Sequence, residues 1–385
     1  MTFPLTQTTP DHSPVHPDKL QQLVSLINRH IAEHRYPGCQ IALAWRGQLL
    51  VNQSLGMSRT GIGHAADTQA MAADNDHVYL LYSNTKILVA TALWVLNDQG
   101  KLRFSDRVAE HLPGFAAHGK QDITLLQLIT HQAGFPDADI PASMWQDHEN
   151  ILQAVCDFPL QWTPGSRVHY HGLSAHWVLA MVIEAVTGMD FREAVSRLVI
   201  APLGLEDDLF MGLPEAQSHR LAYLYEPDAD APMGQRLRDE STNRAWQTAG
   251  VPGGGAYGTA RGMAALYQMM LNGGKLNGVQ LVCEDTLALA IQNHTGERTD
   301  EFMGMPMHRG LGPHLRGHTE VIRGLGSHAP ANAFGHGGVG TSYCWADPNS
   351  GVSFAYLTNS RVPEPWHSQR LNEVSNLVYA AINHG

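Results

Sequence analysis

The chain has 385 residues, of which 43% are hydrophobic and 16% are charged, and its formal net charge is −11. This composition supplies enough apolar material for a large globular core in one or two domains. The sequence has no basic run to meet phosphates and no stretch approaching the roughly 20 apolar residues of a membrane span, which argues against nucleic acid and the membrane as partners.

The N-terminal segment lacks the features of a secretory signal. Residues 1–18 are rich in Thr, Pro and His, without a basic start or an apolar core. If Met1 is the true start, we expect a cytoplasmic protein. The four cysteines are scattered, which is typical of free, mostly buried thiols in a reducing compartment.

The first predicted elements are a helix and a hairpin. Apolar residues at helical spacing indicate an amphipathic helix that stops before Pro37-Gly38, namely Leu20, Leu23, Val24, Ile27 and Ile31. Two strand-like runs follow, Gln40 to Trp45 and Gln48 to Ser54, and we expect them to form a β-hairpin across Arg46-Gly47.

A Ser-x-x-Lys pattern, Ser83 to Lys86, heads the next predicted helix. The run from Asn84 to Asn97 is mostly apolar on all sides, which indicates a buried helix, and Gly100 ends it. A serine needs an adjacent base to act as a nucleophile. The lysine lies one helical turn away, and its desolvation in a buried helix favours the neutral amine that can take the serine proton.

Two further segments carry residue types that suit the same chemistry. A turn at Pro164 leads to Tyr170, ahead of a predicted helix from Ser174 to Val186 that Gly188 closes. A phenol beside a lysine ammonium ionises more readily and can share the role of base. The glycine-rich segment from Phe334 to Gly340 lets backbone N–H groups approach a substrate carbonyl.

The pattern of elements predicts an α/β domain interrupted by a helical one. Two more strand-like runs, Ser342 to Asp347 and Val352 to Asn359, follow the glycine-rich segment, so strands from both ends of the chain are expected to pair. We expect residues 1–75 and 240–385 to form the α/β domain and residues 76–239 the helical domain. The active site is expected in the cleft between them.

Several motifs, in order and at similar spacing, resemble the serine β-lactamase and penicillin-binding protein superfamily. The chain is similar to its class C-like branch, which includes family VIII carboxylesterases and transesterases. The motifs lie at Tyr82 to Leu102, Leu128 to Gly134, Glu184 to Gly188, Ala201 to Leu205 and Phe334 to Gly338. The resemblance covers about residues 38–359 and implies an α/β plus all-α fold, an antiparallel sheet flanked by helices with a mostly helical inserted domain.

The resemblance also implies residue roles. Ser83 is expected to be the acylated nucleophile, Lys86 its activating partner and Tyr170 the second base. The third motif falls on His336, Gly337 and Gly338. The backbone N–H groups of Ser83 and Val339 are expected to form the oxyanion hole.

One position departs from the family pattern and bears on the substrate. Relatives that cleave peptides or β-lactams carry Tyr-x-Asn, whereas the third residue here is Gly172. Without the Asn side chain, recognition of a substrate amide is weakened unless His171 or Ser174 substitutes for it. We therefore expect a carboxylesterase-like hydrolase acting on esters or thioesters. The alternatives are an acyltransferase using the same acyl-enzyme, a β-lactamase or D-amino-acid peptidase or amidase, and a non-enzymatic binding or sensor domain.

The substrate pocket is harder to place. The Gly/His-rich segment from Gly296 to His328 is either a surface excursion or a pocket-forming loop, in which case methionines and a leucine line an acyl pocket, namely Met303, Met305, Met307 and Leu311. Trp145 and Trp162 either wall the site or fill the helical core. Tyr82, His171 and Gly172 complete the expected pocket.

We expect no metal and no other cofactor. His169, His171 and His176 offer imidazole ligands, but Leu173 and Ser174 stand where the Asp and His of a metallo-β-lactamase motif would fall. The expected partners are a small-molecule acyl ester and, for transfer, an acceptor alcohol or amine. The sequence does not predict the oligomeric state.

Overall fold

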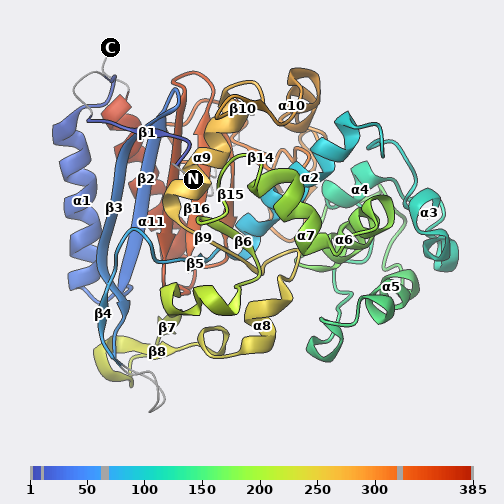
Figure 1. Ribbon diagram of the computed structural model, residues 1–385, viewed down its shortest axis with the longest axis horizontal. Coiled ribbons are helices and arrows are strands. Elements are labelled where there is room, and N and C mark those ends of the chain that lie inside the picture. The colour runs from blue at the N-terminus through green and yellow to red at the C-terminus, as the bar shows by residue number, and fades with distance from the viewer. Residues whose placement is uncertain (1–2, 10–12, 62–68, 319–323, 383–385) are drawn as a thin grey trace.

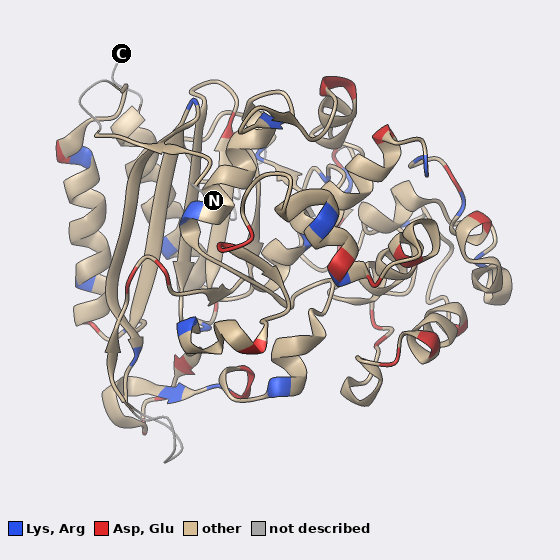
Figure 2. Ribbon diagram, in the orientation of Figure 1, with Lys and Arg blue, Asp and Glu red and all other residues tan. Residues whose placement is uncertain are grey.

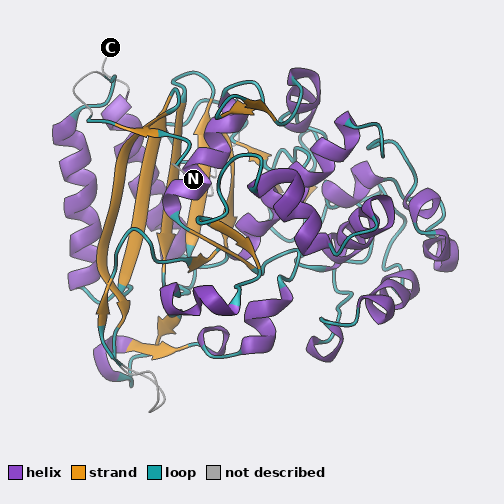
Figure 3. Cartoon of the chain, viewed as in Figure 1, coloured by secondary structure: helices purple, strands orange, loops and turns teal. Residues whose placement is uncertain are grey.

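The computed structural model describes residues 3–9, 13–61, 69–318 and 324–382. One half of the molecule is a large sheet covered by helices on both faces, and the other half is mostly helical (Figure 1). Figure 3 shows the same division, with the long strands gathered on one side and a group of helices on the other. The predicted fold class is confirmed.

The α-helices are α1 (Pro17–Ala32), α2 (Thr85–Asp98), α3 (Val108–His111), α4 (Leu125–Ile129), α5 (His148–Asp157), α6 (Ser174–Thr187), α7 (Phe191–Val195), α8 (Arg244–Ala249), α9 (Ala260–Leu271), α10 (Glu284–Ala290) and α11 (Trp366–Ile382). The longer strands are β2 (Gly38–Trp45), β3 (Gln48–Arg59), β15 (Phe334–Gly338), β16 (Ser342–Asp347) and β17 (Val352–Thr358). The shorter strands are β1 (Thr6–Gln7), β4 (Met71–Ala72), β5 (Tyr79–Leu80), β6 (Leu209–Met211), β7 (Tyr225–Pro227), β8 (Gln235–Leu237), β9 (Ala256–Gly258), β10 (Lys275–Leu276), β11 (Val279–Gln280), β12 (Thr299–Asp300), β13 (Met305–Pro306) and β14 (His314–Leu315).

The main sheet joins the two ends of the chain. Its strand order is β1-β3-β2-β17-β16-β15-β14, with β4 added beside β3. Every pairing is antiparallel except that of β1, which lies parallel to β3. The predicted hairpin is confirmed, because Arg46 and Gly47 both take the positive φ angles that a tight two-residue turn between twisted strands requires. The predicted pairing of strands from both ends is β2 with β17.

Alternation along β2 explains the two helical layers. Ile41 and Leu43 enter the core that α1 and α11 cover, whereas Ala42 and Ala44 face the core on the α9 side. The small alanines let α9 pack closely over β2 and β17. Both faces of the central strands are therefore buried, which makes the sheet a rigid support for the residues at its end.

The predicted helices around the Ser-x-x-Lys pattern are confirmed with small shifts. A 3₁₀ turn, η2 (Tyr82–Asn84), precedes α2. Gly100, which follows the end of α2, has a φ of +68°. The helix α6 ends at Gly188 in the left-handed conformation that glycine adopts without strain. Both helices are apolar on nearly every side because they cross the centre of the helical half, where α2 and α6 are in contact.

The middle of the chain holds more strand than expected. The strands β5, β9 and β6 form a small antiparallel sheet, and β7 pairs with β8. Residues 296–328, read as an irregular loop, contain β12, β13 and β14, while 319–323 lie outside the described residues. Strands this short carry little periodic signal, so their pairing depends on tertiary contacts. The domain boundaries at 75/76 and 239/240 stay a prediction.

No helix among the described residues combines the length and the apolar character needed to cross a bilayer. Figure 2 shows acidic and basic residues interspersed over the elements.

Candidate active site

Ser83 lies in a strained turn between the small sheet and α2. The strand β5 pairs with β9, and the next residue, Leu81, donates its N–H to Ala256 O at 2.9 Å. Tyr82 then takes a positive φ of 43°, which is unfavourable for a residue with a side chain. The turn places Ser83, half-buried, directly ahead of α2.

Lys86 is fully buried in the first turn of α2 and has three hydrogen-bonding neighbours. Its Nζ lies 3.2 Å from Ser83 Oγ, 2.7 Å from Gly172 O and 2.6 Å from Gly253 O. Burial lowers the pKa of Lys86 below its usual value of 10.5, while its interaction with Tyr170 opposes the shift. A neutral amine has two hydrogens for the two carbonyls and one lone pair for the Ser83 hydroxyl. The geometry therefore suits a lysine that takes the serine proton.

Tyr170 approaches Ser83 from the other side. Its hydroxyl lies 2.9 Å from Ser83 Oγ, so the serine oxygen is in hydrogen-bond reach of both expected bases. Two basic side chains flank the phenol, because Lys86 Nζ lies 5.1 Å and the Arg309 guanidinium carbon 5.0 Å from the ring centroid. Arg309 is charged, and Lys86 becomes charged when it takes the serine proton. Cations near an aromatic face are attracted to it, and they also stabilise a developing phenolate charge.

His131 fixes the backbone around Tyr170. The His169 N–H donates to His131 O at 3.0 Å, and the His171 N–H donates to His131 Nδ1 at 3.1 Å. The imidazole itself lies 4.6 Å from the Tyr170 ring, centroid to centroid. Burial lowers the pKa of His131 well below 6.5, which keeps Nδ1 available as an acceptor. His131 stands in one of the family motifs, but no role was expected for it from the sequence.

Asp300 ties Tyr170 to a second segment of the chain. Its buried Oδ1 accepts N–H groups from Tyr170 at 3.1 Å, Phe302 at 3.1 Å and Met303 at 3.3 Å. Its Oδ2 accepts from the Arg309 guanidinium at 2.6 Å, and both side chains of this ion pair are buried. Neither Asp300 nor Arg309 was expected from the sequence, because nothing local to them marks a site.

The strand β15 brings the third motif against the nucleophile turn η2. A side chain at Gly338 would place its Cβ 2.5 Å from Ser342 Oγ and 2.6 Å from Leu81 O, so only glycine permits this approach. The buried amide of Asn84 bridges the two elements in the orientation that satisfies both of its ends. It donates to His336 O at 2.7 Å and accepts from the Gly338 N–H at 3.2 Å.

His336 is held as a neutral imidazole within this motif. Its Nδ1 lies 2.9 Å from Gly337 O, a geometry in which Nδ1 carries the hydrogen and donates. Burial lowers the pKa of His336 well below 6.5, and Lys86 in its protonated form acts in the same direction. Val339, next to the motif, is 48% exposed and lies at the surface of the site.

A cavity of about 720 Å³ contains Ser83 and Tyr170 in its wall. Its lining is Ser83, Tyr170, Glu226, Pro227, Phe302, Met303, Met307, Arg309, His314, residues 336–340, Tyr343, residues 361–364, His367, Ser368 and Leu371. Residues of β7, of the segment around β13, and of the start of α11 and the segment before it thus meet at the end of the main sheet. A volume of this size accommodates a ligand larger than a simple short-chain ester.

Not all of the expected pocket residues line this cavity. Met303 and Met307 do, whereas Met305 lies outside the lining and Leu311 is packed in the core. The buried Tyr82 donates its hydroxyl to Glu240 at 2.8 Å. Trp145 Nε1 donates to Ile140 O, and Trp162 packs against His169, so both indoles pack against the protein. These side chains are engaged by protein groups rather than directed at the cavity.

Gly172 takes part in the site through its backbone carbonyl, whereas the His171 side chain is bonded within the protein. The carbonyl of Gly172 accepts from Lys86, and no atom lies within 4 Å of where its Cβ would be. His171 is buried, with Nδ1 donating to His169 O at 2.7 Å and Nε2 accepting from the Phe135 N–H at 3.2 Å. Because both ring nitrogens of His171 are occupied, it has none left for a metal or a substrate.

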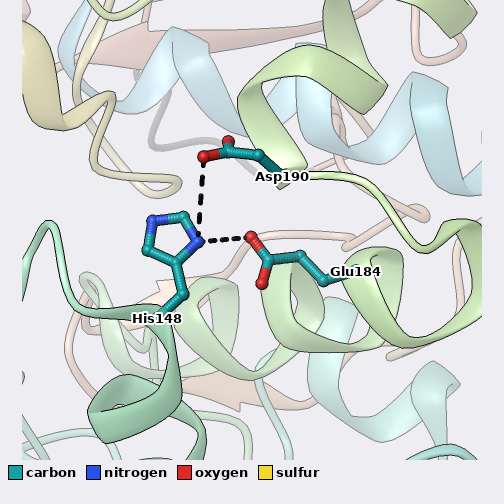
Figure 4. A group of neighbouring side chains, drawn as sticks. All are labelled: His148, Glu184 and Asp190. Atoms are coloured by element: carbon teal, nitrogen blue, oxygen red, sulfur yellow. Dashed lines mark hydrogen bonds and ion pairs between the residues drawn. The ribbon is translucent and has the colours of Figure 1, made fainter.

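One group of side chains among the described residues has metal-ligand types at suitable distances, His148, Glu184 and Asp190 (Figure 4). His148 Nδ1 lies 2.6 Å from Glu184 Oε1 and 3.9 Å from Asp190 Oδ2. Arg192 already neutralises Asp190, with Nε 2.9 Å from Oδ1, and its guanidinium extends to His148. Asp190 and Glu184 also accept backbone N–H groups at the start of α7. A guanidinium inside the group indicates a structural ion-pair network that joins α5, α6 and α7.

Comparison with known proteins places this geometry in a family. A protein of Escherichia coli (strain K12) named "Putative D-alanyl-D-alanine carboxypeptidase" is 26% identical over 98% of this chain and 91% of its own length. A penicillin-binding protein homologue from Caulobacter crescentus has a similar structure, with a TM-score of 0.81 and 25% identity over 95% of this chain and 98% of its own. A family VIII carboxylesterase is similar over the same shares of the two chains, with a TM-score of 0.79 and 25% identity. The profile of the Beta-lactamase family matches residues 23–375, so the chain belongs to the beta-lactamase family.

Proposed function

We propose that this protein hydrolyses carboxylic esters through an acyl-enzyme formed on Ser83. The observation that carries the proposal is the position of Ser83 Oγ, within hydrogen-bond reach of both Lys86 Nζ and Tyr170 OH in the wall of a large cavity. A serine activated by a desolvated amine and a phenol is a nucleophile for acyl transfer. The likeness to a family VIII carboxylesterase supports the choice of substrate class.

In the acylation step the serine proton passes to the leaving alcohol. Lys86 takes the proton as Ser83 Oγ attacks the ester carbonyl, forming the Oγ–C bond of a tetrahedral intermediate. The proton is relayed through Tyr170, which donates it to the alcohol oxygen as the C–O bond breaks. The alcohol leaves neutral, and the acyl group stays on Ser83.

The charge that develops on the carbonyl oxygen needs donors. We assign them to the backbone N–H groups of Ser83 and Val339, which belong to η2 and to the residue after β15. Each such donor contributes roughly 2.7–4 kcal/mol to transition-state stabilisation in related chemistry. The Asn84 amide holds the two elements in register, so the spacing of the two donors is fixed before substrate binds.

Deacylation reverses the first half with a new nucleophile. Water gives up its proton through Tyr170 and Lys86, its oxygen bonds to the acyl carbon, and Ser83 Oγ recovers the proton as the acyl bond breaks. An acceptor alcohol that enters in place of water yields a new ester, which makes an acyltransferase the second candidate function. Both activities use the same residues.

Esters are favoured over amides by the absence of a side chain at Gly172. The position offers a backbone carbonyl to Lys86 and nothing to a substrate amide. An amide or lactam substrate therefore loses a hydrogen bond that an ester does not need. The E. coli relative's name points to a carboxypeptidase, and the same assay tests that alternative.

The test compares p-nitrophenyl butyrate with a chromogenic cephalosporin and a D-alanyl-D-alanine peptide. Wild-type protein is expected to hydrolyse the ester fastest, and Ser83→Ala is expected to lose at least about 10³-fold in kcat. Ser166→Ala, which alters an exposed serine outside the site, serves as the matched control and keeps the wild-type rate. A phosphonate ester should label Ser83 in wild type only.

Two results would reject the proposal. Ester hydrolysis that persists in Ser83→Ala places the chemistry elsewhere. Absence of turnover and of phosphonate labelling in folded wild-type protein favours a binding or sensor domain.

A further inference from the structure

We propose that the cavity beside Tyr170 binds the alcohol part of the ester, and that this alcohol is bulky and apolar. Phe302 and Met307 are the specificity-determining residues. The inference rests on the proposed ester hydrolysis and adds to it which side of the substrate is recognised and by what chemistry.

The position of the proton donor fixes which half of the ester enters the cavity. Tyr170 protonates the leaving oxygen, so the alcohol must lie on the Tyr170 side of Ser83. The Phe302 ring lies on that side, with its centroid 5.9 Å from that of Tyr170. Both residues line the same cavity, and Met303 follows directly on the wall.

The wall and the proton donor form one unit. A single oxygen, Asp300 Oδ1, accepts the N–H groups of Tyr170, Phe302 and Met303. A displacement of the Phe302 backbone therefore disturbs the carboxylate that also holds the Tyr170 backbone. An alcohol resting on Phe302 is positioned relative to Tyr170 by the protein itself, which is what a proton transfer requires.

The lining favours an apolar group. Phe302 is 63% exposed and Val339 48%, two of the few large apolar side chains exposed among the described residues, and both lie at this cavity. Exposed apolar surface at a cavity mouth is typical of ligand contact. Farther from Ser83 the wall continues with Met307, Val362 and Leu371. A cavity of about 720 Å³ with such walls suits an arylalkyl or cycloalkyl alcohol.

Some of the charges in the lining are already compensated. Arg309 is paired with Asp300, and Glu226 with Arg236 and Arg238. Arg361 and Glu364 are exceptions, since both are exposed and neither has an ion pair with a described residue, although Glu364 accepts a hydrogen bond from Ser368. Of these two, Arg361 offers a positive charge to a ligand. An alcohol carrying a carboxylate is therefore the competing ligand, and the test includes one.

The experiment keeps the acyl group constant and varies the alcohol. The substrates are the acetates of ethanol, cyclohexylmethanol, 2-naphthylmethanol and glycolic acid, with kcat/KM measured for each. Wild type is expected to prefer the naphthylmethyl over the ethyl ester by at least about tenfold, and Phe302→Ala and Met307→Ala are each expected to reduce this ratio about tenfold. Leu152→Ala, an exposed leucine on α5, is the control and leaves the ratio unchanged.

A second series keeps ethanol as the alcohol and lengthens the acyl chain from acetyl to octanoyl. The ratio of octanoyl to acetyl ester is expected to be the same in wild type and in Phe302→Ala, because the acyl group lies on the other side of Ser83. If Phe302→Ala changes acyl preference and not alcohol preference, the assignment of the cavity is overturned. A preference for ethyl acetate, or for the glycolate ester with loss in Arg361→Met, also overturns it. Failure of the proposed function is seen separately, as ester turnover that Ser83→Ala does not abolish.

Discussion

At the scale of single residues, the protonation state of Lys86 decides whether Ser83 is activated. The lysine is fully buried, and the acceptors around its Nζ are neutral groups, the carbonyls of Gly172 and Gly253 and the Ser83 hydroxyl among them. No carboxylate is bonded to it among the described residues, which is why desolvation dominates and the pKa falls. The site thus favours the neutral form of Lys86 over its ammonium form.

This arrangement predicts a pH dependence. Because the folded pKa of Lys86 is below 10.5, kcat/KM for an ester should rise with pH and reach its plateau below the pH at which an exposed lysine loses its proton. Lys86→Arg cannot supply a neutral base, so its rate should be at least about 10²-fold lower at every pH. Lys101→Arg, at an exposed lysine, controls for general effects of replacing a lysine by an arginine. Recovery of Lys86→Arg at high pH would contradict the assignment.

Gly172 permits a gain-of-function test. Its φ is not in the left-handed region and space is open where a Cβ would stand, so Gly172→Asn should fold. The new amide is expected to raise the ratio of cephalosporin to ester turnover by about tenfold, since it restores one hydrogen bond to a substrate amide. The measurement is kcat/KM for both substrates in wild type, Gly172→Asn and Gly172→Ala. An equal ratio in all three would show that the missing side chain does not set specificity.

At the scale of elements, the approach of β15 to the nucleophile turn η2 sets the geometry of the proposed oxyanion hole. In Gly338→Ala the new methyl carbon would lie 2.5 Å from Ser342 Oγ and 2.6 Å from Leu81 O, so these atoms or β15 must move. We expect a loss of about 1–3 kcal/mol in the free energy of unfolding and a larger fall in kcat than in KM. Urea unfolding and ester kinetics on the same preparation measure both. An unchanged kcat in a stably folded variant would show that the close approach of β15 is not needed for catalysis.

The sequence was informative where an element carries its own signal. The helices α2 and α6 and the hairpin follow from local periodicity and glycine placement, and Ser83, Lys86 and Tyr170 come together as the family motifs implied. The strained turn at Tyr82 was not predicted. The Asp300 contact with Tyr170 spans 130 positions, and the residues of α11 that line the cavity join from farther away. Contacts of that range leave no local pattern. The sequence did not decide whether Trp145 and Trp162 line the pocket or fill the core, because an indole serves either purpose.

At the scale of the whole molecule, buried neutral histidines make stability depend on pH. Burial lowers the pKa of His171 from 6.5 to about 4, and the pKa values of His131, His176 and His336 fall well below 6.5 for the same reason. Below pH 6.5 these histidines bind protons in the unfolded chain but not in the folded chain. The free energy of unfolding is therefore highest above pH 6.5 and decreases as the pH falls towards 4. His171 alone accounts for ~3 kcal/mol of this loss.

Urea midpoints measured from pH 7.5 to pH 4.5 check this prediction. The midpoint should fall steadily below pH 6.5 in wild type, and the fall should be smaller in His171→Gln, which removes one titrating group. His118→Gln, at an exposed histidine, should leave the slope unaltered. A midpoint that is flat across this range would contradict the prediction that the buried rings stay neutral.

The central pairing of the main sheet has a consequence for how the protein is made. The Gly38 N–H of β2 donates to Asn359, just after β17, across 321 positions of sequence. On the ribosome, β2 and β3 therefore emerge long before their neighbour exists, and their apolar faces and the open backbone edge of β2 stay uncovered meanwhile. The nascent chain is then a natural client for a chaperone, and a stop codon ahead of β17 should yield an insoluble product even though every proposed catalytic residue has been synthesised.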